Sequence, residues 1–198
     1  MGFSITWFAV PEASAESFLQ KLGLVQTGDT EDCPDSLISF AVMDTGWRVL
    51  WYNKYLCPFL STEAVRDLSG EIDILVCTVE EHCMDSSSAL WRDGQRRWYL
   101  HHDGSAGAKG LDVEGSPPDY FPSIRADMER QQLAAGGPTA DVDYLFEIPL
   151  SVAQGLTGFK HDEESPSMVD GLFHVLKLTT APTTPEPKRG FLGKLFGR

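Results

Sequence analysis

The apolar run at residues 72–79 constrains the fold more than any other feature of the sequence, with Asp73 as its only charge. A run of this length and composition is typical of a strand that is covered on both faces. Residues 3–10 are rich in aromatic and β-branched side chains and are followed by Pro11, which predicts a second strand of the same kind. The sequence therefore predicts a sheet whose centre is buried.

Turn residues between further apolar runs predict hairpins. The runs at residues 37–43 and 47–52 flank Asp-Thr-Gly at residues 44–46, which supplies the chemistry of a tight turn. Apolar residues recur at helical spacing in residues 14–22 and 119–135. Paired strands with a few helices between them predict an α+β fold: a mainly antiparallel β-sheet with a few helices packed on one face.

The Asp93-Gly94 dipeptide is the strongest hairpin signal in the chain. A two-residue loop there places Trp91 opposite Arg96. Because side chains alternate along a strand, Trp91 and Trp98 are then expected on the same face, where they would pack.

The last part of the domain predicts three more elements. Residues 142–148 have the composition of a strand, residues 150–156 predict a short helix, and residues 173–178 predict a final strand. Residues 1–178 are therefore expected to form a single α+β domain.

Composition changes after that domain. Residues 179–187 are rich in Pro and Thr and lack apolar side chains able to pack, so they predict an extended linker. Residues 188–198 contain four basic residues and no acidic one, and they predict a basic amphipathic C-terminal peptide.

The net charge of the chain limits the classes of partner that it can bind. The 198 residues carry a formal net charge of -13, with 16 Lys and Arg against 29 Asp and Glu. Without the four basic residues of the C-terminal peptide the net charge is -17, because 12 basic residues then face 29 acidic ones. Such a body repels nucleic-acid phosphates, so no nucleic-acid ligand is predicted, whereas a basic protein partner fits.

Cysteine usage and the N-terminus indicate the compartment. Cys33, Cys57, Cys77 and Cys83 include no Cys-x-x-Cys pair, so they predict reduced thiols rather than a disulfide framework or a zinc site. No secretory signal and no membrane-spanning run is predicted. We expect a cytoplasmic protein with no cofactor and no metal.

Several short motifs lie along the domain: Met-Gly-Phe-Ser-Ile-Thr-Trp at residues 1–7, Val-Glu-Glu-His at 79–82, Trp-Arg-Asp-Gly at 91–94 with Trp98, His-Asp at 102–103, Val-Asp at 142–143, Ile-Pro-Leu at 148–150 and Thr-Gly-Phe at 157–159. Together they resemble an uncharacterised family of bacterial single-domain proteins of about this size. The resemblance implies a bacterial, non-secreted protein with one domain. It implies no activity.

One polar cluster contains residue types that perform acid/base chemistry or bind metals. If the strands continue, Glu80 and His82 share a face, and His102 with Asp103 at a strand end completes a candidate catalytic site. His101 is expected to point to the opposite face from His102. None of the usual metal-ligand spacings is present. Polar residues at strand ends that bond to loops are the alternative interpretation.

A second histidine lies in an acidic run. His161 precedes Asp162, Glu163 and Glu164. This composition predicts a solvated loop.

The C-terminal peptide is the more specific functional feature. In a helix, Phe191, Leu192, Leu195 and Phe196 would occupy one face, with Lys194 and Arg198 outside it. Its three glycines, at about 1 kcal/mol each relative to alanine, make the free peptide a poor helix. We expect it to order on an anionic membrane, in a groove on a partner, or against the acidic body. A peptide with no role is the remaining alternative.

The sequence predicts a non-catalytic protein-interaction protein, of adaptor or immunity type, with the C-terminal peptide as a tether or second binding site. The alternative is a small hydrolase or metal-dependent enzyme that uses Glu80, His82, His102 and Asp103. Convergence of these four side chains in a pocket would favour the enzyme.

Overall fold

A computed structural model of the protein describes residues 2–179, except for the side chains of residues 107–109. Apart from Thr179, the predicted linker and C-terminal peptide lie outside the described residues. Within the described part of the chain, no helix is both long enough and apolar enough to cross a membrane.

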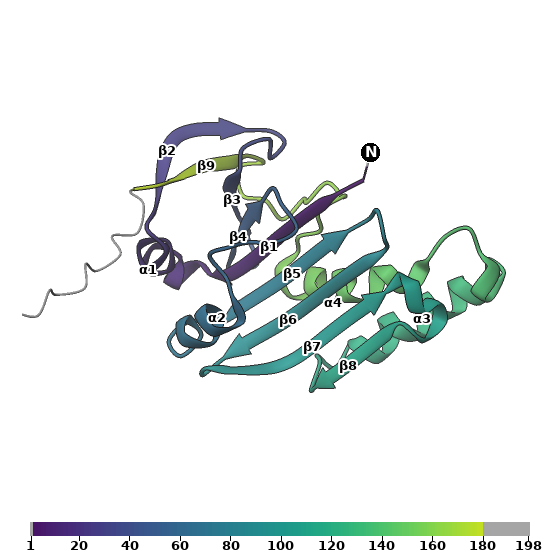
Figure 1. Cartoon of the computed structure of the whole chain (residues 1–198). Helices are drawn as coiled ribbons and strands as arrows, with labels where there is room; N and C mark the ends of the chain where they lie inside the picture. Colours follow the sequence, from purple (N-terminus) through teal and green to yellow (C-terminus); the bar gives the residue numbers. More distant parts are fainter. Residues whose placement is uncertain (1, 180–198) are drawn as a thin grey trace, which may run out of the picture.

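One antiparallel sheet of nine strands forms the core of the fold (Figure 1). The strands lie in the order β2-β9-β3-β4-β1-β5-β6-β7-β8. They are β1 (Ser4–Pro11), β2 (Leu24–Glu31), β3 (Ile38–Val42), β4 (Trp47–Tyr52), β5 (Ile74–Glu80), β6 (Asp85–Arg92), β7 (Gln95–Asp103), β8 (Leu111–Gly115) and β9 (Phe173–Leu178). The predicted α+β class with a mainly antiparallel sheet is confirmed.

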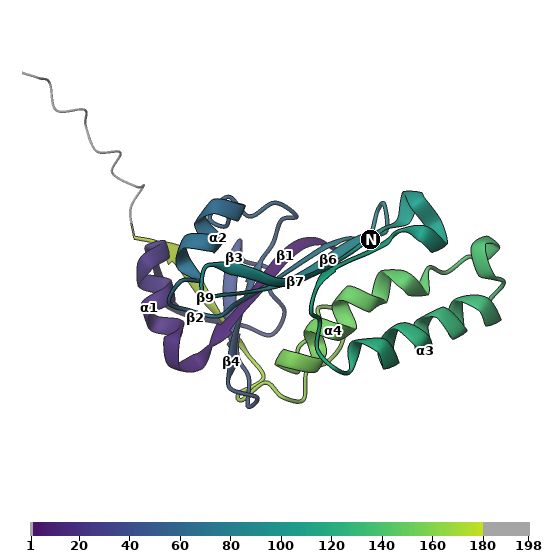
Figure 2. The same ribbon diagram turned by 90° about the horizontal axis from the view of Figure 1, so that it is seen from below.

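Helices cover both faces of the sheet, so the expectation that they pack on one face is wrong (Figure 2). The helices are α1 (Glu12–Leu22), α2 (Thr62–Leu68), α3 (Phe121–Ala134) and α4 (Glu147–Thr157), with 3-10 turns η1 (Gly104–Lys109), η2 (Gly137–Thr139) and η3 (Tyr144–Phe146). The pair α1 and α2 packs on one face, and the pair α3 and α4 packs on the other. A strand that is apolar on both sides needs a cover on each.

β1 is the strand that both layers share. Ile5, Trp7 and Ala9 belong to the hydrophobic cluster beneath α4, whereas Phe8 and Val10 belong to the cluster beneath α1 and α2. All five side chains are almost fully buried. β1 also pairs with β4 on one side and with β5 on the other. The prediction of a doubly buried strand at residues 3–10 is therefore confirmed.

The Asp93-Gly94 turn forms as predicted, but the two tryptophans do not share a face. Asp93 and Gly94 both have positive φ, and Trp91 pairs with Arg96. A register shift then places Trp98 opposite Leu90. The extra residue reverses the alternation, so Trp98 packs in the cluster beneath α4 while Trp91 lies against the other cluster.

Residues 142–148 are not a strand, contrary to the prediction. The Asp143 carboxylate accepts a hydrogen bond from the backbone N–H of Leu145 at 3.1 Å, which caps η3. Pro149 lies in the first turn of α4, where its missing N–H would have no intrahelical partner. The predicted helix at residues 150–156 is confirmed and begins earlier, at Glu147.

Gly115, at the end of β8, cannot carry a side chain. Its φ is +73°, and a Cβ placed on it would lie 2.1 Å from the carbonyl oxygen of Arg97. Gly46 has a similar φ of +85°, but a Cβ there would meet nothing within 4 Å. A side chain at Gly46 would therefore cause backbone strain alone, whereas a side chain at Gly115 would cause both backbone strain and a steric overlap.

We predict that Gly115→Ala lowers the free energy of unfolding by about 3 kcal/mol or more. The alanine would have a strained backbone conformation, and β8 would also have to shift away from the Arg97 carbonyl. Gly46→Ala, the matched control, is expected to cost about 1–2 kcal/mol. Urea unfolding of the two variants measures the difference, and equal costs would contradict the described β7–β8 geometry.

Candidate functional site

The four residues of the predicted catalytic site do not come together. Glu80, at the end of β5, bonds through Oε1 to Nδ1 of His82 at 2.7 Å, and His82 is two-thirds exposed. The Ser4 hydroxyl and His82 together hold the pKa of Glu80 below its usual value. Asp103 accepts the backbone N–H of Ser105 at 2.9 Å. Each of these contacts stabilises a strand end.

His102 lies on the opposite face of the sheet from Glu80. Val79, Ser86 and His102 are paired across β5, β6 and β7, and they face α4. His102 is fully buried, and its Nε2 bonds to the Asp143 carboxylate at 2.8 Å. The histidine is therefore a structural partner of η3, and its predicted role in catalysis stays a prediction without a site around it.

His101 is the histidine that faces the carboxylates. Its Nε2 lies 2.8 Å from Asp85 Oδ2, and the Tyr55 hydroxyl donates to Asp85 Oδ1 at 2.7 Å. Burial and the Asp85 carboxylate both raise the pKa of Tyr55, which stays neutral. The Tyr55 carbonyl in turn accepts the Thr6 hydroxyl. This network fixes the segment between β4 and α2 onto the sheet.

Among residues 2–179, no group of three or more His, Cys, Asp or Glu side chains is arranged to hold a metal ion. Cys77 is fully buried, and burial raises the pKa of its thiol. A thiol that is buried in apolar surroundings is unreactive, so Cys77 is not a candidate nucleophile.

A cleft at the N-terminal end of β1 is the better candidate site. It consists of two adjoining cavities of about 470 and 480 Å³. Both are lined by Phe3, Cys33, Pro34, Trp51 and His161. The walls are the connection from β2 to β3 and the segment after α4. Each volume lies within the range of pockets that bind small ligands.

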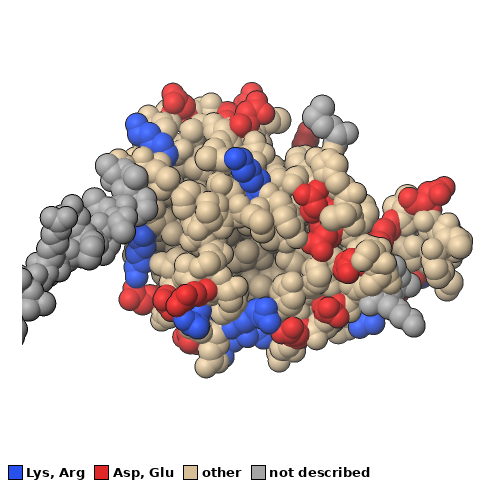
Figure 3. Space-filling view, in the orientation of Figure 1, with Lys and Arg blue, Asp and Glu red and all other residues tan. Residues whose placement is uncertain are grey.

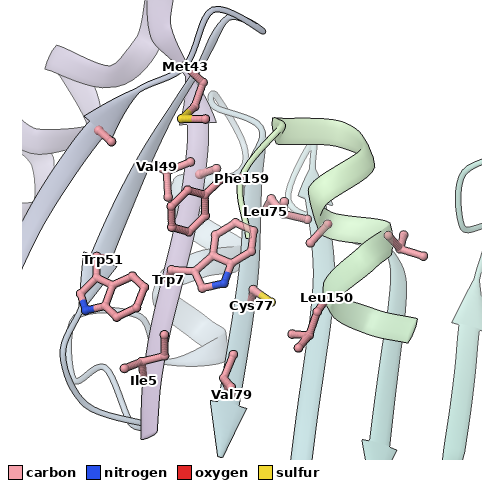
Figure 4. Packing of buried hydrophobic residues seen from close by; sticks show 14 of the residues in the cluster. Ile5, Trp7, Met43, Val49, Trp51, Leu75, Cys77, Val79, Leu150 and Phe159 are labelled. Atoms are coloured by element: carbon pink, nitrogen blue, oxygen red, sulfur yellow. The ribbon is translucent and has the colours of Figure 1, made fainter. Parts of the chain in front are cut away.

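The floor of the cleft is aromatic. Phe159 contacts Trp7 edge to face at a centroid distance of 5.2 Å, and Trp51 lies 6.4 Å from it (Figure 4). The ring of Phe173 lies 6.2 Å from Phe159. Phe3 also packs edge to face on Trp51, at a centroid distance of 5.9 Å. Edge-to-face pairs contribute about 0.5–1.5 kcal/mol each beyond their buried area, so these contacts stabilise the floor.

Phe159 reaches the cleft because α4 ends abruptly. Gly158 takes the left-handed conformation with φ +75°, and the Thr157 hydroxyl accepts the backbone N–H of Phe159 at 3.1 Å. A Cβ on Gly158 would lie 2.9 Å from the Ser167 hydroxyl. The turn therefore requires glycine and directs the next residues back onto the sheet.

His161 closes one end of the cleft, and its side chain is 1% exposed. The prediction of a solvated loop is thus wrong for this residue. Its Nε2 lies 3.3 Å from Glu81 Oε1, and its ring packs edge to face on Phe3 at 4.9 Å. Glu81 also accepts the Phe3 backbone N–H at 2.8 Å. A carboxylate oxygen only accepts a hydrogen bond, so Nε2 is the donor to Glu81, and the other ring nitrogen, Nδ1, lies 3.6 Å from Asp162 Oδ1.

Two buried ring nitrogens that belong to the cleft residues lack a hydrogen-bond partner among the described residues. They are Nδ1 of His161 and Nε1 of Trp51. Burial of an unpaired polar group costs about 1–3 kcal/mol.

Lys160 holds the acidic wall of the cleft in place. Its Nζ lies 3.1 Å from Glu147, 3.2 Å from Asp162 and 2.8 Å from Glu163. Burial acts to lower the pKa of Lys160, but the hydrogen bond to Glu163 and the other two carboxylates outweigh it and raise the pKa. The Lys160 hydrogen bond is also the main reason that the pKa of Glu163 lies below its usual value.

The rim carries more carboxylates than Lys160 can neutralise. The acidic residues that line the two cavities are Asp32, Asp35, Asp162, Glu163 and Glu164. All five are exposed. The cleft thus combines an apolar floor with an anionic edge.

Sequence reasoning missed this site because its residues come from four separate segments, 2–3, 32–35, 51–53 and 159–173. Phe159 in an otherwise polar loop was the available signal, since a large aromatic side chain after a helix-ending glycine is usually buried. No protein-family model, curated protein or solved structure matches the chain. The cleft is therefore judged on its own geometry.

We predict that Lys160→Met lowers the free energy of unfolding by on the order of 2 kcal/mol near neutral pH, because three carboxylates lose their cation. Glu163 contributes its stability above its usual pKa of 4.5 and loses it as the pH falls through its lowered folded pKa. The cost of the substitution should therefore shrink in acid. Urea unfolding at about pH 7 and about pH 3.5 tests this.

Lys54→Met is the matched control, since Lys54 is exposed and outside the cleft. Its cost should be within about 0.5 kcal/mol of zero at both pH values. A cost of Lys160→Met that is independent of pH would show that the ion cluster does not form.

Proposed function

We propose that the chain is a cytoplasmic, non-catalytic protein-interaction module, and that its cleft binds an apolar side chain from a basic segment of a partner protein. The observation that carries this proposal is the pairing of an aromatic floor with an exposed acidic rim in one cleft. An adaptor or immunity role fits a binding surface of this kind.

The aromatic floor supports recognition of a bulky apolar side chain. Burial of one Phe or Leu side chain contributes about 1.5–3 kcal/mol. Two such side chains would supply about 5 kcal/mol, which corresponds to a dissociation constant on the order of 0.1–1 mM. Tight binding therefore needs a second contribution.

The acidic rim supplies that contribution. Lys or Arg residues beside the apolar anchor would face Asp32, Asp35 and Glu164, which form no ion pair within the described residues. Charges at the edge of an interface mainly accelerate association and fix orientation. Binding should accordingly weaken as salt rises.

The rest of the surface is consistent with a basic protein partner. On the face in Figure 3, acidic side chains lie along most of the outline, with basic side chains among them. The whole chain is strongly anionic. Such a surface repels phosphates, so we propose no nucleic-acid ligand.

The reduced state of the cysteines supports the proposed location in the cytoplasm. The four cysteines are free thiols, and Cys33 and Cys83 are exposed. Exposed free thiols suit a reducing compartment such as the cytoplasm.

The proposal predicts that charge reversal at the rim removes the partner. The full chain, the double variant Asp32→Lys/Glu164→Lys and the matched control Asp119→Lys/Asp141→Lys would each be used to capture proteins from a lysate of the cells that make it. All four positions are exposed, and the control pair does not line the cleft.

We expect one basic protein to be retained in stoichiometric amount by the full chain and the control, and to be reduced at least tenfold on the rim variant. Quantitative mass spectrometry measures the ratio. Capture of nothing in stoichiometric amount, or equal capture by both variants, would refute the proposed use of the cleft.

A further inference from the structure

We propose that the chain's own residues 188–198 occupy the cleft, so that the protein blocks its binding site until a partner displaces its C-terminus. This inference rests on the proposed function, because it takes the cleft to be a site for a basic apolar segment. Residues 188–198 would then compete with the partner protein for the cleft.

The C-terminal segment has the composition that the cleft selects. Residues 188–198 read Lys-Arg-Gly-Phe-Leu-Gly-Lys-Leu-Phe-Gly-Arg. Phe191 and Phe196 supply aromatic anchors. The segment also contains four basic residues and no acidic residue. The cleft offers the complementary surface, which consists of the aromatic floor and the exposed carboxylates of Asp32, Asp35 and Glu164.

The chain is long enough to make this contact. β9 begins at Phe173, which lines the cleft, and runs to Leu178, so Thr179 lies about 20 Å from the cleft at about 3.3 Å per residue. The Thr179 backbone N–H is fixed to the Gly23 carbonyl at 2.9 Å. Eight residues separate Thr179 from Lys188 and span about 25 Å even as a polyproline helix. The three residues before Phe191 extend that reach further.

The hollow beside Thr179 is a poorer site for the same segment. It is larger, at about 680 Å³, and it lies closer to the chain end. Among the described residues that line it there is one carboxylate, Glu16, and no aromatic ring. Glu16 is already bonded to Arg48. It therefore offers the segment neither a free charge nor an aromatic surface.

Attachment makes even a weak contact effective. A short tether gives an effective concentration of about 1 mM. A C-terminal segment that binds with a dissociation constant of about 0.1 mM would then fill the cleft in about nine molecules of ten. A partner that competes for the cleft would bind about tenfold more weakly than to an open cleft.

Cys33 provides a direct probe, because it is exposed and lines both cavities. In the full chain carrying Gly193→Cys, mild oxidation would link the new thiol to a nearby cysteine. Cys83 is exposed as well and lies outside both cavities, so it serves as the internal reference. Labelling of Cys33 and Cys83 by iodoacetamide corrects for their different reactivities.

We expect the corrected rate of intramolecular disulfide formation with Cys33 to exceed that with Cys83 at least tenfold, as read by mass spectrometry of the non-reduced monomer. Adding Phe191→Ala and Phe196→Ala to the same chain should remove that excess. Equal rates with the two cysteines, or an excess that the two alanines leave unchanged, would overturn the proposal.

The same chains mixed with phosphatidylglycerol vesicles test the competing occupant. Co-sedimentation that depends on Phe191 and Phe196, without a preference for Cys33, would assign the segment to membranes and overturn the intramolecular contact. Failure here is separable from failure of the proposed function, because the rim variants can lose a partner whether or not the C-terminus ever enters the cleft.

Discussion

The burial of β1 on both faces is the constraint on which the rest of the structure depends. Trp7 and Phe8 are neighbours in sequence, yet each lies at the centre of a separate hydrophobic cluster. The Phe8 side requires α1 and α2, and the Trp7 side requires α4. Phe159 extends the cover of Trp7 beyond the end of α4 and so draws Lys160 and His161 down to the sheet.

The cleft follows from that cover. Phe3 continues β1 past the last residues that α4 shields, and Trp51 stands beside it on β4. Together with Phe159, which is also largely buried, they form the apolar floor of the cleft. The surrounding loops contribute carboxylates, and Lys160 balances only those on one wall. The candidate site is therefore where the second layer of the fold stops.

Local sequence predicted the elements that are decided locally. The strand at residues 3–10, the turn at Asp93-Gly94 and the amphipathic helix near residues 121–134 each carry their own period or turn chemistry. β2 was not predicted, because its mostly polar residues are held in a strand by pairing with β9, far along the chain. One extra residue before Trp98 was enough to reverse the predicted face of that side chain.

The four predicted site residues lie on opposite faces of the sheet and the cleft was missed, for related physical reasons. The alternation of side chains did separate His101 from His102, but only the packing of η3 decided that His102 is the buried member. His161 was assigned to solvent on the composition of its neighbours. Its burial depends on Glu81 and Phe3, which are far from it in sequence and near it only in the folded chain.

The central claim is that the cleft holds a basic apolar segment. Hydrogen–deuterium exchange tests it most directly, in the full chain and in the full chain with Phe191→Ala/Phe196→Ala. The account predicts faster exchange of residues 31–36 and 159–165 in the variant, with β8 at the far edge of the sheet unchanged. Identical exchange of both cleft segments in the two chains would contradict it.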